Sequence, residues 1–215
     1  MNMTTKKLTA TAMFCALAYV AVAIGRIPVI LFLSYDPKDI IITLGGLIYG
    51  PLTAGIISVV VSLVEMVTIS DTGIIGLIMN ILSSCSFACT ASFIYTKKRT
   101  LFGAVLGLIV GSLSMIAVML LWNYLITPLY MNATREQITN MLLPVFLPFN
   151  ALKSGLNAGF TFLLYKPVIN ALRKGGFIEP SSANSKKKTS WGAILIASIV
   201  IITCILFVLS LKGII

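Results

Sequence analysis

The sequence of 215 residues contains no histidine and only 10% charged residues, and each shortage excludes a class of protein. Without histidine the chain cannot form an HExxH zinc site, a Ser-His-Asp triad or any site with histidine as general acid or base. It also lacks a GxxxxGK(S/T) motif, the loop with which many ATPases hold phosphate. We therefore expect a protein that is not an enzyme.

The shortage of charge also excludes a soluble globule, because a typical soluble domain carries roughly 25% charged residues. Hydrophobic residues make up 58% of this chain, and its mean hydropathy is +1.03. In lipid, backbone groups must be satisfied within helices or a closed barrel. The apolar runs are long and do not alternate with polar residues, which favours helices over a barrel. The sequence therefore predicts an all-α integral membrane protein.

Acidic residues are scarce as well, with 6 Asp and Glu against 16 Lys and Arg and a net charge of +10. The basic residues gather in short segments between apolar runs, as the positive-inside rule describes, rather than on a soluble basic face. We expect no nucleic-acid partner. With a cytoplasmic N-terminus, only four cations lie outside: Arg26, Lys38, Arg135 and Lys212. The cytoplasmic cations are then Lys6, Lys7, Lys97, Lys98, Arg99, Lys166, Arg173, Lys174 and the three lysines of residues 186–188.

Cysteine offers little chemistry in this chain. The four cysteines, Cys15, Cys85, Cys89 and Cys204, all lie in apolar runs. Cys85 and Cys89 share a helix face, but no histidine and no nearby carboxylate completes a metal site. We interpret all four as small core residues and expect no metal.

The apolar runs predict the organisation of the chain. They cover residues 8–25, 39–50, 51–70, 73–96, 101–127, 140–172 and 191–211. The second run is short for a hydrocarbon core of about 30 Å, so its neighbours must shelter it. We expect a six-helix membrane domain over residues 1–175, a basic cytoplasmic linker over residues 176–190, and an additional transmembrane helix within residues 191–215.

The best candidate site lies in the sixth run. Asn150, Lys153 and Asn157 follow one another at i, i+3 and i+7 and therefore share one helix face. A lysine at the membrane centre costs about 2.5–3.5 kcal/mol on insertion scales, so its presence favours a function. One ammonium and two amides suit a ligand rich in carbonyls and hydroxyls. The alternative is that Lys153 extends outward to the interface while the amides bind neighbouring helices.

Two weaker candidates lie in the fourth and fifth runs. Asn80 and Ser84 are one helical turn apart, although small polar residues also serve helix packing. Asn123 lies between Trp122 and Tyr124, aromatic residues that usually mark a membrane interface.

The acidic residues near the first loop have more than one interpretation. Asp36 and Asp39 flank Pro37 and Lys38, and Asp39 suits the first turn of a helix as a capping residue. Glu65 lies inside the third apolar run. Three interpretations are open from the sequence: the Glu65 carboxyl is protonated, it is paired with a lysine, or it belongs to a path that couples ion movement to transport.

The first apolar run contains a pair of small residues one turn apart, Ala12 and Ala16. This spacing lets another helix approach closely. The pair serves either internal packing or the docking of a separate membrane subunit.

Four segments together resemble one known family. They are AMFCA at residues 12–16, FLSYDPKDI at 32–40, DTGIIGLIMN at 71–80 and LPFNALKSG at 147–155. In order and spacing they are similar to the riboflavin-binding S components of ECF-type vitamin transporters, over roughly the first 175 residues. The resemblance implies a six-helix bacterial cell-membrane protein. Its Ala12 and Ala16 face would dock onto a transmembrane coupling subunit, and two cytoplasmic ATPase subunits would supply energy.

The resemblance also implies a ligand and its contacts. Riboflavin is then the transported solute rather than a cofactor, and Asn150 and Lys153 contact it. The resemblance implies ligand contacts less strongly for four further residues, Leu77, Asn80, Thr43 and Asn123. The residues suit this ligand, because apolar side chains fit the dimethylbenzene end of the flavin, while amides fit the pyrimidine edge and Lys153 fits the ribityl hydroxyls.

Two alternatives remain open from the sequence. In the first, the chain is an S component for another vitamin such as thiamine. In the second, it is a self-sufficient secondary transporter in which Glu65 or Lys153 couples an ion. Six helices suffice for the family, so the resemblance assigns no role to residues 191–211.

Overall fold

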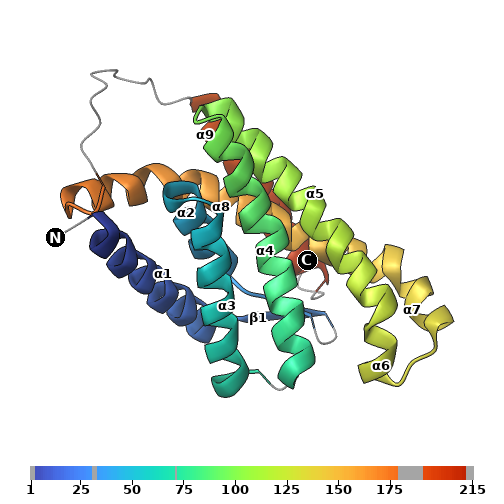
Figure 1. Ribbon diagram of the computed structural model, residues 1–215. Coiled ribbons are helices and arrows are strands. Elements are labelled where there is room, and N and C mark those ends of the chain that lie inside the picture. The colour runs from blue at the N-terminus through green and yellow to red at the C-terminus, as the bar shows by residue number, and fades with distance from the viewer. Residues whose placement is uncertain (1–2, 31–32, 71, 179–190, 212–215) are drawn as a thin grey trace.

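The computed structural model describes residues 3–30, 33–70, 72–178 and 191–211 (Figure 1). Its long helices are α1 (Met3–Gly25), α2 (Lys38–Tyr49), α3 (Pro51–Thr68), α4 (Gly73–Lys97), α5 (Leu101–Leu125), α8 (Leu147–Lys174) and α9 (Trp191–Leu211). Between α5 and α8 lie the short helices α6 (Thr127–Met131) and α7 (Arg135–Met141) and the π-helical turn η1 (Leu142–Phe146). The protein is mostly helical, as the apolar runs predicted.

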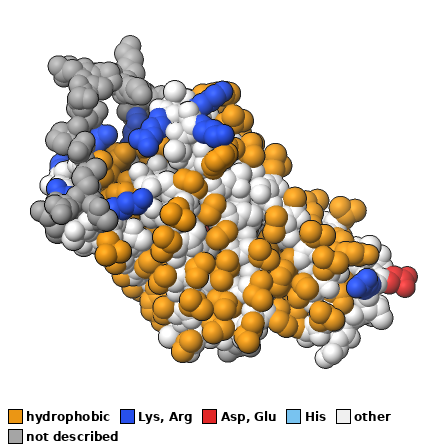
Figure 2. All heavy atoms as spheres, viewed as in Figure 1, with side chains coloured by type: hydrophobic (Ala, Val, Ile, Leu, Met, Phe, Trp, Pro, Cys, Tyr) orange, Lys and Arg blue, Asp and Glu red, His pale blue; other side chains and the backbone are white. Residues whose placement is uncertain are grey.

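Four of these helices are long and apolar enough to cross a membrane: Thr5–Gly25, Pro51–Thr68, Gly73–Lys97 and Leu101–Leu125. The short α2 and the polar α8 do not meet this criterion. Figure 2 shows apolar side chains over most of the visible face, as expected where lipid replaces water. Lys and Arg gather at the end of the molecule where α4 meets α5 and where α8 ends.

A small β-hairpin between α1 and α2 departs from the all-α prediction. Strands β1 (Ile27–Ile30) and β2 (Leu33–Tyr35) pair antiparallel, with Ile27 opposite Tyr35. Residues with branched or aromatic side chains favour such strands. The segment is too short to stand out from the neighbouring apolar runs in the sequence.

The sixth apolar run is also divided differently from the prediction. The predicted span over residues 140–172 becomes the end of α7, the turn η1 and then α8. Pro144 lies inside η1 and Pro148 in the first turn of α8, and a proline lacks the N–H that would continue a regular α-helix. As a result, Asn150 and Lys153 lie in the first two turns of α8.

Helix α2 is sheltered by its neighbours, as its short length required. Its buried residues pack against α1, α3 and α8 in one core, to which Ile42, Ala54 and Phe14 belong. Gly50, with φ of 101°, ends α2 in a conformation that suits glycine, and Pro51 starts α3. This packing places the polar first turn of α2 inside the protein.

Helix α9 packs against α8 through two glycines. A Cβ atom at Gly159 would lie 2.7 Å from Cγ1 of Ile201, and one at Gly155 would lie 3.2 Å from Sγ of Cys204. Small residues at this spacing let two helices approach closely. Most of the predicted basic linker, residues 179–190, lies outside the described residues.

Candidate functional site

A cluster of charged side chains lies where β2, α2, α3 and α8 meet. It contains three cations and three carboxylates, so the charges balance: Arg26, Lys38 and Lys153 with Asp36, Asp39 and Glu65. Lys38, Asp39 and Glu65 are fully buried. Buried charges are tolerated when they are paired and hydrogen-bonded, because the desolvation penalty is then offset.

Lys153 is held by two carboxylates, that of Asp36 just before α2 and that of Asp39 in its first turn. Its Nζ lies 3.5 Å from Oδ2 of Asp36 and 3.6 Å from Oδ2 of Asp39. The side chain therefore points into the protein, and the alternative in which it extends outward to the interface is wrong.

Asp39 lies in the first turn of α2, as expected, but it is not the N-cap residue. Its Oδ1 accepts a hydrogen bond from Ser84, and its Oδ2 accepts one from Asn157 at 3.3 Å. The N-cap of α2 is Pro37, with no side-chain hydrogen bond to the first turn. The carboxylate turns instead toward α4 and α8, where it joins three helices.

Glu65 is paired with cations, which is one of the three interpretations open from the sequence. Its Oε2 forms an ion pair with Lys38, and its Oε1 lies 3.5 Å from Nη1 of Arg26. Asn80 also donates a hydrogen bond to Oε1, at 3.1 Å. This carboxylate thus links the hairpin, α2 and α4.

Arg26 is the most open member of the cluster, with 30% of its side chain exposed. Its Nε lies 3.6 Å from Oδ1 of Asp36. Beside it, burial and the nearby Asp39 and Asp36 raise the pKa of Tyr35, so this phenol stays neutral. The sequence analysis counted Arg26 only as a loop cation.

A small cavity opens beside this cluster, with a volume of about 30 Å³. Its polar lining comes from Arg26, Ser34, Asp36, Asn80, Ser83, Asn150 and Lys153. Its apolar lining comes from Leu33, Met79, Met119 and Phe149. Small-molecule pockets usually measure about 300–1,000 Å³, so this conformation is nearly closed.

The predicted stripe on α8 is buried but divides into two parts. Asn150 and Lys153 line the cavity, and the amide nitrogen of Asn150 donates to the carbonyl oxygen of Phe146 at 2.8 Å. Asn157 does not line the cavity and instead holds Asp39. For Asn157 the helix-bridging alternative applies.

The other candidates divide in the same way. Asn80 lines the cavity, whereas Leu77, one turn earlier, is half-buried outside it. Thr43 is buried and donates to the backbone oxygen of Asp39. Asn123 is buried between the Met119 carbonyl and Thr127, to which it is hydrogen-bonded, and it does not line the cavity.

Ala12 and Ala16 are both exposed on α1, while Phe14 and Ala18 face the core. The small pair is therefore free of internal packing within the described residues. No three His, Cys, Asp or Glu residues in the described part of the chain are placed to hold a metal ion.

Comparison with known proteins gives three consistent matches. The family model described as "ECF transporter, substrate-specific component" matches residues 6–165. The riboflavin transporter RibU of Staphylococcus aureus (strain TCH60) is 29% identical over 179 residues, which cover 79% of this chain and 93% of that protein. A solved structure, reported as "Structure and mechanism of the S component of a bacterial ECF transporter", superposes with a TM-score of 0.66 at 27% identity. That match covers 79% of this chain and 99% of the solved one.

Proposed function

The chain belongs to the family of ECF transporter substrate-specific components, and from this premise we propose that it captures riboflavin in the membrane for uptake by separate energising subunits. The observation that carries the proposal is the meeting of Asn80, Asn150 and Lys153 at one cavity whose other wall is apolar. The similarity to a riboflavin transporter over 79% of the chain supports the choice of ligand.

The lining suits the two ends of a flavin. The dimethylbenzene end packs against apolar side chains such as Leu33, Met119 and Phe149. The pyrimidine edge alternates hydrogen-bond donors and acceptors, and the Asn150 amide supplies both. Lys153 donates to the ribityl hydroxyls. Small-ligand sites typically combine apolar surface with polar groups that fix the orientation of the ligand, and this lining contains both.

Binding requires the cavity to widen, because about 30 Å³ does not admit a three-ring system. The wall formed by Leu33 and Ser34 of the hairpin is the part that moves in our proposal. Arg26, directly before the hairpin, lies 3.5 Å from Glu65 of α3 and 3.6 Å from Asp36 on the other side of the hairpin, and its own side chain is 30% exposed. Ion pairs of this length that involve a partly exposed side chain are weak, so in our proposal they break when the hairpin moves.

Energy for transport comes from partners in this proposal. A transmembrane coupling subunit docks on the exposed Ala12 and Ala16 face, and two cytoplasmic ATPases drive the cycle. The N-terminus lies in the cytoplasm, since the Lys and Arg residues gather at that end of the bundle. Helices α1 to α5 and α8 then form the six-helix substrate-binding domain, and α9 is an addition.

Titration of riboflavin fluorescence with the purified chain tests the ligand. We expect saturable quenching that excess thiamine does not reverse. Thiamine binding without flavin binding would assign the chain to another vitamin.

A second measurement separates capture from self-sufficient transport. Proteoliposomes that hold this chain alone should not accumulate riboflavin under a proton or sodium gradient. Accumulation would establish the secondary-transporter alternative.

A further inference from the structure

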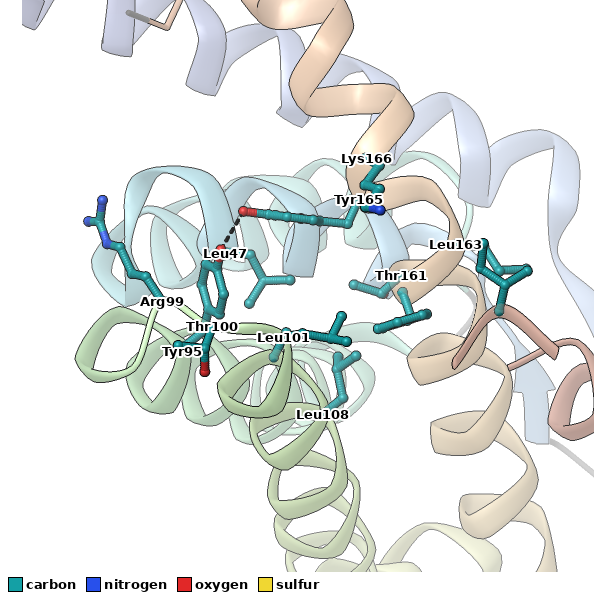
Figure 3. A pocket seen from close by; sticks show the side chains of 13 residues that line it. Leu47, Tyr95, Arg99, Thr100, Leu101, Leu108, Thr161, Leu163, Tyr165 and Lys166 are labelled. Atoms are coloured by element: carbon teal, nitrogen blue, oxygen red, sulfur yellow. Dashed lines mark hydrogen bonds between the residues drawn. The ribbon is translucent and has the colours of Figure 1, made fainter. Parts of the chain in front are cut away.

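A larger cavity lies at the opposite end of the bundle from the flavin site, with a volume of about 200 Å³ (Figure 3). It is lined by the end of α4, the start of α5, the second half of α8, the start of α9 and Leu47 of α2. Neither the proposed function nor the family comparison assigns it a role. Its lining changes in character along the axis of the bundle.

The rim is cationic and polar. Arg99 and Lys166 lie there, both exposed, and Arg99 has no carboxylate partner among the described residues. Next to them, the hydroxyls of Tyr95 and Tyr165 are hydrogen-bonded at 2.6 Å, as the dashed line in Figure 3 marks. An arginine at such a rim suits a phosphate group, which it binds through two parallel hydrogen bonds.

The interior is apolar apart from one hydroxyl. Ala104, Leu108 and Phe162 line it, whereas Leu101, on the same face of α5 as Ala104 and Leu108, is 49% exposed. Thr161 of α8 is fully buried, and its hydroxyl has no hydrogen-bond partner within the described structure. An unpaired buried hydroxyl costs free energy, so this position favours an occupant that brings a polar atom into an apolar space.

We propose that this cavity binds one anionic phospholipid from the leaflet that faces the basic end of the bundle. The phosphate lies at Arg99 and Lys166, an ester carbonyl oxygen accepts from Thr161, and part of an acyl chain fills the space beside Leu108. The order of charge, hydroxyl and apolar surface matches the order of groups along a phospholipid. Anionic leaflets attract clustered cations near the membrane surface.

A helix of a partner protein does not fit the same space. With its side chains a helix is about 10–12 Å across, which exceeds what a cavity of about 200 Å³ admits. A chain of methylene groups is far thinner. The dimensions therefore favour lipid over a protein segment.

Native mass spectrometry of the full chain in neutral detergent, with added phosphatidylglycerol, tests the site. We expect one phosphatidylglycerol to remain bound where phosphatidylcholine and inorganic phosphate do not. Arg99→Gln should lower the affinity for phosphatidylglycerol about fivefold, since one cation near a lipid headgroup contributes on that order. Ala104→Trp should abolish retention because the indole fills the cavity.

Matched variants control for indirect effects. Lys98→Gln removes the neighbouring cation that does not line the cavity, and Ile109→Trp adds an indole on the lipid-exposed side of α5. Both should retain the lipid.

Thr161→Val provides a second test if Ala104→Trp does not fold, because it removes only the hydroxyl, and it should weaken phosphatidylglycerol binding. Equal retention of phosphatidylcholine, equal binding of inorganic phosphate, or unchanged phosphatidylglycerol affinity in Arg99→Gln and Thr161→Val would each overturn the proposal.

Discussion

At the scale of single residues, Lys153 has two tasks that mutation can separate. It neutralises Asp36 and Asp39 in the folded protein, and in our proposal it donates to the flavin. Lys153→Met leaves buried carboxylates without their cation, so we expect a loss of about 3–5 kcal/mol in the free energy of unfolding. Flavin affinity should fall about tenfold or more, as expected for a lost hydrogen bond from a charged group.

The double variant Lys153→Met with Asp39→Asn separates these effects. Removal of the second charge should restore most of the stability without restoring flavin binding. Unfolding in a denaturing detergent and fluorescence quenching measure the two quantities. Recovery of both together would show that Lys153 supports the fold and does not contact the ligand.

Asn150 and Asn157 provide a second prediction, because they share a helix face but have different neighbours. Asn150 lines the cavity, whereas Asn157 donates to Asp39. Asn150→Ala should weaken flavin binding about tenfold, which corresponds to one hydrogen bond in a buried site. Asn157→Ala should lower the melting temperature and leave flavin affinity less changed. The reverse order in a titration of both variants would exclude this division of the stripe.

The sequence located these two residues but could not divide their roles. Their spacing predicts a shared face, since helix geometry alone determines it. Which partner each meets depends on helix packing across distant parts of the chain, as in the contact of Asn157 with Asp39, 118 residues away. The roles of Arg26 and Asp36 escaped prediction for the same reason. The available signal was that acidic and basic residues occur together around the first loop, while Glu65 and Lys153 lie inside apolar runs.

At the scale of elements, apolar runs and their breaks predicted most helices. Gly50 and Pro51 separate α2 from α3, and the basic residues after Tyr95 end α4, as expected. The hairpin and the turn η1 were missed, because hydropathy does not distinguish a short buried strand or a π-turn from a helix. The hairpin lines the smaller cavity through Leu33 and Ser34, and η1 lies directly before α8, whose Phe149 lines it as well. Irregular backbone at membrane depth is tolerated where it lines a cavity.

The packing of α9 on α8 gives a prediction for an element that has no counterpart within the matched residues 6–165. A Cβ atom at Gly155 would lie 3.2 Å from Sγ of Cys204, close to the geometry of a disulfide. In a chain without its other three cysteines, Gly155→Cys should form a disulfide with Cys204 on mild oxidation. Mass spectrometry of the linked peptides detects it.

Gly159→Cys is the matched control for this crosslink. Its Cβ atom faces Ile201 rather than Cys204, so it should remain reduced under the same conditions. If neither variant crosslinks, α9 does not lie on α8 in the membrane. If both crosslink equally, α9 slides along α8 instead of holding one position.

At the scale of the whole molecule, the polar features divide between the two ends of the bundle. The flavin cavity with its balanced charges lies at one end, and the basic residues and the larger cavity lie at the other. An apolar surface connects them on the visible face. In our proposal a coupling subunit approaches from within the membrane through the exposed Ala12 and Ala16 face of α1.

The exposed pair on α1 gives the last prediction, which concerns assembly rather than ligand capture. Ala12 and Ala16 are exposed and lie far in sequence from the cavity residues, so Ala12→Trp with Ala16→Trp should leave flavin affinity unchanged. Two indoles prevent the close helix approach that small residues allow, so riboflavin uptake by cells that supply the coupling subunit and ATPases should be lost.

The control replaces Leu113 and Ala117, an equally spaced exposed pair on α5, by tryptophan and should keep uptake. Since both variants place two indoles at exposed helix positions one turn apart, a shared loss would indicate general damage. Normal uptake by the α1 variant would place the docking surface elsewhere.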